Sequence, residues 1–227
     1  MLTAETVKTM ARELGADLVG IAPVERFTAA PQGYHPRDVL PGCRSVVVLA
    51  CHFNPATLDA ASTSPYWVTR NYCADRMNHM APALAQAMME GGAVSLPIAS
   101  NYPDNWDERT ERYRGTISLK HAGELAGLGH IGRNTLLVND RLGNMMWLSA
   151  VLTEAELTPD PLADYQACIP GCRRCVDACP VHALDGELID QLACHGHAFG
   201  TRGKNEYRIH CYACRKVCPN RTGLVLR

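Results

Sequence analysis

Two cysteine-rich stretches decide how the chain is expected to fold: CIPGCRRCVDACP at residues 168–180 and CYACRKVCPN at residues 211–220. The first has the spacing C-x3-C-x2-C-x3-C-P, and the second has the spacing C-x2-C-x3-C-P. Together with Cys194, which lies between them, they supply eight cysteines. Eight thiolates are enough for two sites of four ligands each, so the sequence predicts a metal-binding segment in this part of the chain.

Three kinds of site use cysteines in such patterns. A run closed by Cys-Pro is typical of bacterial two-cluster ferredoxins, in which the fourth cysteine of a run ligates the other [4Fe–4S] cluster. Structural zinc also uses C-x2-C pairs, and disulfides occur in exported chains, but neither needs two crossing Cys-Pro closures. The expected ligands are therefore Cys168, Cys172, Cys175 and Cys218 for the first cluster, and Cys179, Cys194, Cys211 and Cys214 for the second. Cys168 is the least regular ligand, because three residues separate it from the next cysteine where two are usual.

The composition is that of an ordinary globular protein. The chain has 227 residues, of which 47% are hydrophobic and 20% are charged, and this suits one or two domains. A net charge of −1 gives no electrostatic argument for nucleic acid or a membrane surface. No basic segment followed by an apolar one, no twin arginine and no apolar run of about 18 residues is present. We therefore expect a cytoplasmic protein with no membrane contact.

Helices and strands alternate before the cysteines. We expect helices at 3–14, 71–90 and 116–126, and strands at 17–22, 45–52, 94–99, 135–138 and 144–153. The run SVVVLACH at 45–52 has no polar alternation, so it should be buried on both faces of a sheet. This order predicts an α/β or α+β fold. The prolines of 158–164 mark a linker between a domain at 1–160 and a second domain at 161–227.

The segment AGLGHIGRNT at 126–135 is the most distinctive one outside the cysteines. Its glycines have the G-x-G-x-x-G spacing, which binds dinucleotides when it follows a strand and opens a helix. Here a predicted helix precedes the glycines and a predicted strand follows them, so we reject dinucleotide binding. We expect instead a loop whose glycines let the backbone approach a flat ligand.

AGLGHIGRNTLLVNDRLGNMMWLSAVLT at 126–153, followed by the two cysteine stretches, resembles epoxyqueuosine reductases. More broadly, it is similar to the cobalamin-dependent iron–sulfur reductases, which include reductive dehalogenases. The resemblance implies a nitroreductase-like domain that binds a corrinoid base-off, followed by a two-cluster ferredoxin-like domain. It also implies, by position in the glycine loop of the family, that the corrinoid-binding residues are Gly127, Gly129, His130, Gly132, Arg133 and Asn134.

The same resemblance points to a proton donor. Epoxyqueuosine reductases place a general-acid aspartate thirteen residues before the alanine of this loop, and counting back from Ala126 leads to Tyr113. Reductive dehalogenases are thought to use a tyrosine, so Tyr113 is a candidate catalytic acid, and the alternative is a partly buried aromatic residue of a loop. A tyrosine pKa near ~10 restricts it to protonating a strongly basic anion. Asp104, Asp107 and Glu108 are other donors nearby.

The implied function is a reductase that passes electrons through two [4Fe–4S] clusters to the corrinoid, which then reduces a small organic substrate. An external low-potential donor such as ferredoxin or flavodoxin would supply the electrons, and we expect them to reach the second cluster first. The sequence ends nine residues after Cys218 and lacks the extension of tRNA-acting members, so tRNA is not expected as a partner. Two alternatives are an electron-transfer module that reduces a corrinoid or a partner protein without its own substrate, and a flavin in place of the corrinoid.

Overall fold

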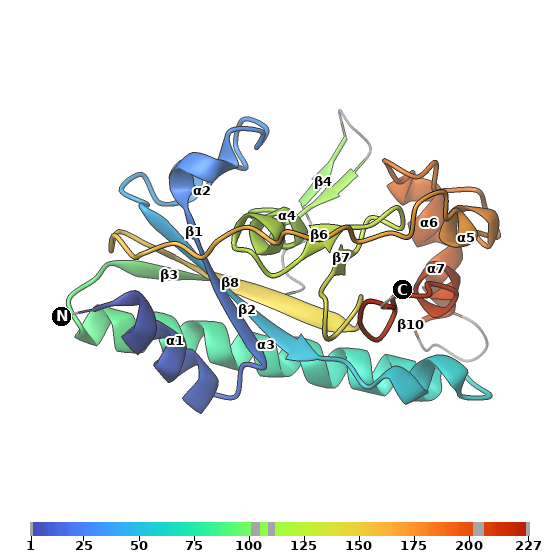
Figure 1. Cartoon of the computed structure of the whole chain (residues 1–227), viewed down its shortest axis with the longest axis horizontal. Coiled ribbons are helices and arrows are strands. Elements are labelled where there is room, and N and C mark those ends of the chain that lie inside the picture. Colours follow the sequence, from blue (N-terminus) through green and yellow to red (C-terminus); the bar gives the residue numbers. More distant parts are fainter. Residues whose placement is uncertain (1, 101–104, 109–111, 202–206, 226–227) are drawn as a thin grey trace.

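Helices cover both faces of a four-stranded sheet, and the cysteine-bearing helices gather at one end of it in the computed structural model (Figure 1). The structure describes residues 2–100, 105–108, 112–201 and 207–225. The helices are α1 (Ala4–Glu13), α2 (Pro36–Val39), α3 (Ser64–Glu90), α4 (Leu119–Leu125), α5 (Arg174–Asp177), α6 (Gln191–Ala198) and α7 (Ala213–Lys216), with short 3-10 turns at Val24–Phe27 and Pro55–Asp59. The strands are β1 (Leu18–Pro23), β2 (Ser45–His52), β3 (Ser95–Ile98), β4 (Asn105–Asp107), β5 (Arg112–Arg114), β6 (His130–Ile131), β7 (Leu137–Val138), β8 (Met146–Thr153), β9 (Phe199–Thr201) and β10 (Tyr207–Ile209).

The main sheet has the strand order β1-β2-β8-β3, and every neighbouring pair is antiparallel. At its centre, Val48 of β2 lies opposite Gly20 of β1 on one side and Ala150 of β8 on the other. The predicted mixture of helices and strands is confirmed. Because the strands are antiparallel, the α+β form of that prediction describes the sheet.

Strand β2 is buried on both faces, as its apolar run predicts. Successive side chains of a strand point to opposite faces, and here the two sets enter two different cores. Val47, Leu49 and Cys51 pack in the core under α3, whereas Val46, Val48 and Ala50 pack in the core under α4. Cys43, Cys51 and Cys73, which lie outside the two cysteine runs, are buried as well.

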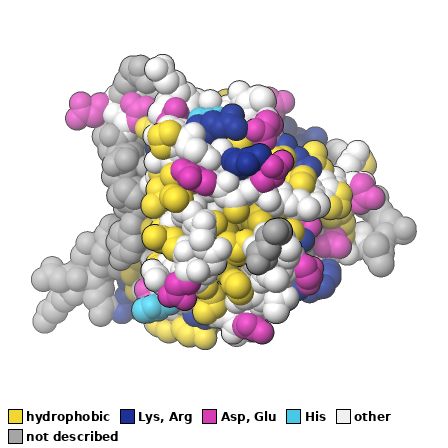
Figure 2. All heavy atoms as spheres, turned by 90° about the vertical axis from the view of Figure 1, so that its left-hand side faces the viewer, with side chains coloured by type: hydrophobic (Ala, Val, Ile, Leu, Met, Phe, Trp, Pro, Cys, Tyr) yellow, Lys and Arg dark blue, Asp and Glu magenta, His cyan; other side chains and the backbone are white. Residues whose placement is uncertain are grey.

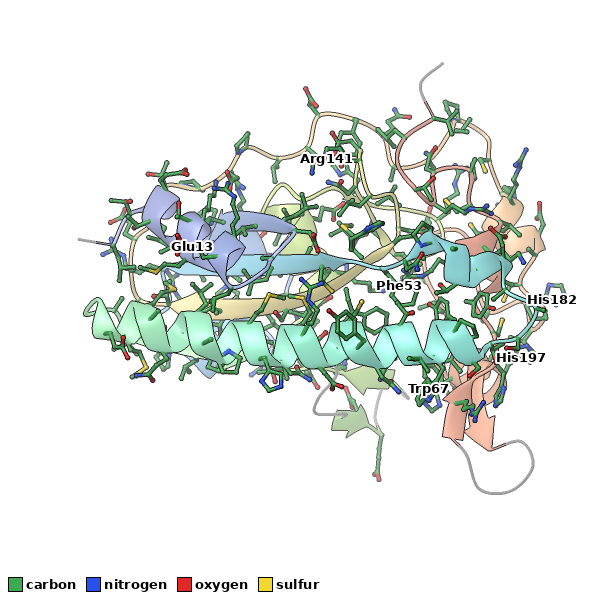
Figure 3. The ribbon with its side chains drawn as sticks, turned by 90° about the horizontal axis from the view of Figure 1, so that it is seen from below. Glu13, Phe53, Trp67, Arg141, His182 and His197 are labelled. Carbon is green, nitrogen blue, oxygen red and sulfur yellow. The ribbon has the colours of Figure 1, made fainter. Side chains whose placement is uncertain are left out.

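Helix α3 begins earlier than the sequence predicts. The helix was expected at 71–90 but starts at Ser64, because Pro65 in its first turn lacks an N–H group that would have no partner inside the helix. Pro82 lies inside one continuous helix and is exposed. Figure 3 shows α3 running along the sheet, with Phe53 and Trp67 near the end that meets the cysteine-bearing segment.

Aromatic and cationic side chains fix the cysteine-bearing segment to the sheet. Tyr66 of α3 stacks on Tyr212 with a centroid separation of 4.2 Å, and it also packs on Phe53 at 4.8 Å. The buried Arg215 donates a hydrogen bond to the carbonyl oxygen of Asn144, and its guanidinium lies 5.8 Å from the ring of Phe53. The cysteines are therefore held in a defined position relative to β2 and β8.

The predicted linker is anchored at Asp160. Its carboxylate accepts a hydrogen bond of 2.5 Å from Nζ of Lys8 and one of 2.8 Å from the backbone N–H of Ile21. Arg26 donates to the carbonyl oxygen of Asp160 at 2.8 Å and to that of Leu125 at 2.6 Å. The segment leading to the cysteines is thus tied across α1, β1 and the start of the glycine loop.

No helix in the described ranges combines the length and the apolarity that crossing a membrane would need. Figure 2 shows one end of the molecule, where acidic and basic side chains are interspersed around an apolar area.

The core under α3 makes a direct prediction. Leu84 is fully buried there, so Leu84→Ala should lower the free energy of unfolding by about 2–5 kcal/mol through lost burial and a residual cavity. Met89, on the same helix, is 52% exposed, and Met89→Ala should change the free energy by no more than about 0.5 kcal/mol. Denaturant unfolding of both variants checks this, and equal losses would contradict the described packing of α3.

Candidate functional site

The eight cysteines form two groups, of which the first cysteine group contains Cys168, Cys172, Cys175 and Cys218. Burial raises the pKa of Cys175, and the nearby thiols of Cys168 and Cys172 raise it further. Burial likewise raises the pKa of Cys218 to about 11, and the other three thiols of the group add to that rise. These mutual effects place the four sulfur atoms close to one another.

The second cysteine group contains Cys179, Cys194, Cys211 and Cys214. Burial raises the pKa of Cys194, and the thiols of Cys179 and Cys211 raise it further. Burial raises the pKa of Cys214 to about 11; Arg215 opposes that rise, while Cys194 and Cys211 add to it. Cys175 of the first group also acts on Cys214, so the two groups are neighbours.

The thiols that act on one another come from both runs, as the crossed spacing predicts for neighbours, and their role as cluster ligands stays a prediction. Cys218, the last cysteine of the second run, lies with the first run, and Cys179, the last of the first run, lies with the second. Helices α5 and α7 pack side by side between the groups. Across the described residues, no three Cys, His, Asp or Glu side chains converge closely enough to bind a single metal ion.

The glycine loop packs against the first cysteine group. The backbone N–H of Arg133 donates to Sγ of Cys168 at 3.3 Å, and its guanidinium donates to the carbonyl oxygen of Cys172 at 2.6 Å. A Cβ atom on Gly132 would lie 3.4 Å from Sγ of Cys168. In the second group, the backbone N–H of Ala183 donates to Sγ of Cys179 at 3.2 Å. Such N–H···S bonds stabilise thiolates.

At Gly127 and Gly129, the structure shows a different reason for glycine than the expected approach of a flat ligand. Gly127 has a φ of +75°, and a Cβ atom there would collide with the carbonyl oxygen of Pro161. Gly129 has a φ of +153°, and a Cβ atom there would collide with the carbonyl oxygen of Val138. Both glycines therefore permit close approach of protein backbone rather than of a flat ligand. Contact between this loop and a corrinoid stays a prediction.

His130 and Asn134 have different surroundings. Nδ1 of His130 lies 3.2 Å from a carboxylate oxygen of Glu124, and Nε2 lies 3.0 Å from the carbonyl oxygen of Ala163. Both ring nitrogens are thus engaged by protein. The amide oxygen of Asn134 accepts from the backbone N–H of Leu136, whereas its buried Nδ2 has no hydrogen-bond partner. A buried donor without a partner is costly, so Asn134 is suited to donate to a bound group.

A pocket of about 690 Å³ lies between α4 and the start of α6. Its lining includes Arg26, Phe27, Tyr34, Arg114, Lys120, His121, Glu124 and Gln191. Cofactor sites fall in this range of volumes. Within the described residues, none of the six predicted corrinoid-loop residues lines it. Gln191 opens α6, the helix that carries Cys194, so the second cysteine group is the one beside the pocket.

No motif in the sequence points to the residues of this lining. Lys120 belongs to the predicted helix at 116–126, and Gln191 and Arg26 belong to no motif. A lysine that turns inward from a short helix has the same sequence signature as one that points to solvent. Only the relative placement of α4 and α6 reveals that they share a pocket.

The first cysteine group borders a second cavity, which is separate from this pocket. A surface groove of about 880 Å³ is lined by Cys218 together with Arg174, Lys216 and Arg221. The first group is therefore the one reached from this surface, and the second group is the one beside the pocket. The sequence predicts that external electrons reach the second cluster first, whereas the groove beside the first group favours the opposite order. The sequence could not reveal it, because the spacing of the cysteines does not say which group faces outward.

The structure describes the backbone of Tyr113 but not its side chain. Tyr113 lies in β5 opposite Trp106 of β4. The next residue, Arg114, lines the pocket and lies 4.7 Å over the ring of Tyr34. Asp107 forms an ion pair of 3.3 Å with Arg114. Asp104 and the remaining part of the predicted loop at 101–104 and 109–111 lie outside the described residues.

Comparison with known proteins bears on this arrangement. No protein-family model matches the sequence. An epoxyqueuosine reductase of Lactococcus garvieae is 39% identical over 110 residues, which cover 44% of this chain and 30% of that protein. The Bacillus cereus enzyme of the same name is 25% identical over 202 residues, which cover 84% of this chain and 51% of that protein. The predicted resemblance to epoxyqueuosine reductases is confirmed. The chain spans about half or less of the length of these two relatives.

Solved structures share the fold. An epoxyqueuosine reductase with an epoxyqueuosine-modified tRNA-Tyr stem loop has a TM-score of 0.69, with 18% identity over 96% of this chain and 65% of that one. A reductive dehalogenase for which a B12-dependent mechanism is suggested has a TM-score of 0.72, with 21% identity over 96% of this chain and 32% of that one. At these identities the likeness shows a shared fold. An epoxyqueuosine reductase and a reductive dehalogenase thus both share the fold of this chain.

The expectation of a small-molecule substrate and no tRNA partner is wrong. A structure that shares the fold over 96% of this chain carries a tRNA stem loop. The error came from treating the net charge of −1 as evidence about a binding surface, although net charge is a sum over the molecule and does not report local charge. The position at which the sequence ends carries no argument either.

The free-energy cost of the steric collision at Gly127 can be measured separately from the cost of its left-handed backbone conformation. Gly92, which follows the C-terminal end of α3, has a similar φ of +89° but nothing within 4 Å of a Cβ atom. Gly92→Ala should therefore cost only the left-handed strain, about 1–2 kcal/mol. Gly127→Ala should cost about 1–3 kcal/mol more, because the linker at Pro161 must move. Denaturant unfolding measures both, and equal costs would contradict the close approach of the loop to the linker.

Proposed function

We propose that the chain is an iron–sulfur reductase with two [4Fe–4S] clusters that serves a corrinoid and acts on an epoxyqueuosine-type nucleoside of tRNA. The observation that carries the proposal is the crossed grouping of the eight cysteines, four and four. It is supported by the sequence relationship to epoxyqueuosine reductases. In the finer division, residues 1–160 form the nitroreductase-like corrinoid domain and residues 161–227 form the ferredoxin-like domain.

The separation of the thiols favours clusters over zinc. Tetrahedral zinc draws four ligands onto one ion at about 2.3 Å each, whereas each cysteine of a [4Fe–4S] cluster binds a different iron. Thiols that influence each other without converging on one point fit the second case. Asn134 supports it further, since its partnerless Nδ2 lies in the loop that donates to Cys168. We assign Asn134 and Arg133 to the first cluster.

The pocket between α4 and α6 is the proposed corrinoid site. A corrinoid supplies, when bound, a redox-active cobalt. Lys120 and Gln191 form the wall toward the second cysteine group, and Arg26 and Tyr34 lie elsewhere in the lining. The amide and charged side chains here suit the amide groups around a corrin ring, and the apolar Phe27 suits its face. The predicted contacts of Gly127, Gly129, His130 and Gly132 with a corrinoid have no support from this lining.

We infer the direction of electron flow from the positions of the surface groove and the pocket. A carrier in the groove beside Cys218 would reach the first cluster, and the second cluster lies next to the pocket. Cys175 and Cys214 act on each other across the two groups, so the step between clusters is short. We therefore propose the order groove, first cluster, second cluster and pocket.

Two features of the pocket suit a modified nucleoside. Removal of an epoxide oxygen as water takes two electrons and two protons, and Tyr113, two residues before Gly115 of the pocket lining, is the proposed donor of one proton from its hydroxyl. Arg114 stacks over Tyr34 at 4.7 Å, and such cationic and aromatic surfaces can hold an unstacked base. Both residues belong to the lining.

Anaerobic reconstitution tests the proposal. Iron and sulfide analysis should give about eight irons per chain, as two four-iron clusters require. With cobalamin and a chemical reductant, the protein should remove the epoxide oxygen from a tRNA stem loop that carries epoxyqueuosine. Mass spectrometry of the nucleoside measures this conversion. About one or two zinc ions and no sulfide would overturn the cluster assignment. Eight irons with no conversion would overturn the substrate assignment and leave an electron carrier.

Tyr113→Phe tests the proton donor. Removing the hydroxyl should lower the rate of conversion by about 10²-fold or more, the usual contribution of general acid catalysis. Tyr72, which is 60% exposed on α3, provides the matched control, and Tyr72→Phe should leave the rate unchanged. Iron content must be the same in all three proteins. A rate for Tyr113→Phe equal to that of the control would remove Tyr113 from the mechanism.

A further inference from the structure

Lys120 links three parts of the molecule, namely α4, the pocket and the glycine loop. It belongs to α4, it lines the pocket, and its Nζ donates a hydrogen bond of 2.6 Å to the carbonyl oxygen of Thr135 in the glycine loop. Thr135 has a φ of +58°, a left-handed conformation that is unusual for a β-branched residue. The hydrogen bond therefore holds the ammonium group and this turn in a fixed relation, while the stem of the lysine forms part of the pocket wall.

The charges that act on Lys120 come from the second cysteine group. Burial lowers the pKa of Lys120, and Cys194 and Cys214 oppose that shift. The effect is reciprocal at Cys194, whose pKa Lys120 lowers. Lys120 also shares the pocket lining with Gln191, which lies three residues before Cys194 on α6. The ammonium group is thus placed on the side of the pocket that borders the second cysteine group.

We propose that Lys120 is a positioning residue that raises the reduction potential of the second cluster relative to the first. An added electron makes a cluster and its four thiolates more negative, and a cation held nearby stabilises this reduced state. The effect is strong where water is excluded and weak where charges are solvated. Burial, hydrogen bonds and nearby charge are among the features that set cluster potentials. The inference rests on the proposed function, since it presupposes a cluster in the second cysteine group.

A higher potential of the second cluster gives electron transfer between the two clusters a direction. Raising the potential of the second cluster draws each electron from the outer first cluster toward the pocket. Lys216 offers the contrast, because it is close in sequence to Cys214 and Cys218 but lies 46% exposed in the surface groove, where it faces Asp59 at 3.7 Å. Water and salt screen its charge. The two lysines thus carry the same charge, but Lys120 is half-buried in the pocket wall whereas Lys216 is exposed in the surface groove.

Redox titration followed by EPR tests the inference on anaerobically reconstituted chains without a corrinoid. Lys120→Met should lower the midpoint potential of one cluster and leave the other unchanged. We expect a roughly tenfold lower ratio of reduced to oxidised second cluster at a fixed potential, which is about 59 mV for a one-electron couple. Lys120→Arg should restore most of the potential, because it keeps the charge. Lys216→Met should leave both potentials unchanged.

The outcomes separate this inference from the proposed function. Failure of the unmodified chain to bind about eight irons would defeat the proposed function itself. Full iron content with unchanged potentials in Lys120→Met would defeat only the role of Lys120. Lys120→Gln keeps a hydrogen-bond donor toward Thr135 but removes the charge, so it guards against misfolding of the methionine variant. An equal fall in both potentials, or a fall in Lys120→Arg as large as in Lys120→Met, would also overturn the inference.

Discussion

The crossing of the two cysteine runs is the constraint on which the rest of the structure depends. The first run keeps three cysteines at one site and gives its last, Cys179, to the other. The second run keeps two cysteines, which share their site with Cys194, and gives its last, Cys218, to the first site. Segments separated by about thirty residues must therefore lie against each other, which places α5 beside α7. Short helices of four residues have little stability of their own. In the proposed function, the ligands shared between the two runs, rather than helix propensity, explain why these helices pack together.

A second set of contacts positions this unit relative to the sheet. The stack of Tyr66 on Tyr212 and the hydrogen bond of the buried Arg215 to Asn144 join α3 and the segment just before β8 to the second cysteine run. A buried guanidinium is tolerated only where its donors are satisfied and its charge is compensated, and here it lies among a carbonyl oxygen, an aromatic ring and the thiol of Cys214. The pocket that α4 lines also has Gln191, the first residue of α6, in its lining.

The sequence predicted the features that depend on local chemistry. The helix predicted at 3–14 and the doubly buried β2 follow from the pattern of neighbouring residues, and the structure has both. It did not predict features that depend on which distant segments meet. The start of α3 at Ser64, the protein neighbours of Gly127 and the inward turn of Lys120 are of this kind. The mistaken exclusion of tRNA had the same origin, since a global charge was used where a local surface was needed.

The measurement that tests the crossing most directly is the iron content of paired cysteine variants. If the groups are crossed, Cys175→Ala with Cys218→Ala damages a single site, and about four irons should remain with one cluster signal in EPR. Cys214→Ala with Cys218→Ala then damages both sites and should leave almost no cluster iron. The reverse result, with iron retained in the second pair and lost in the first, would show that each run builds its own site and would contradict the account.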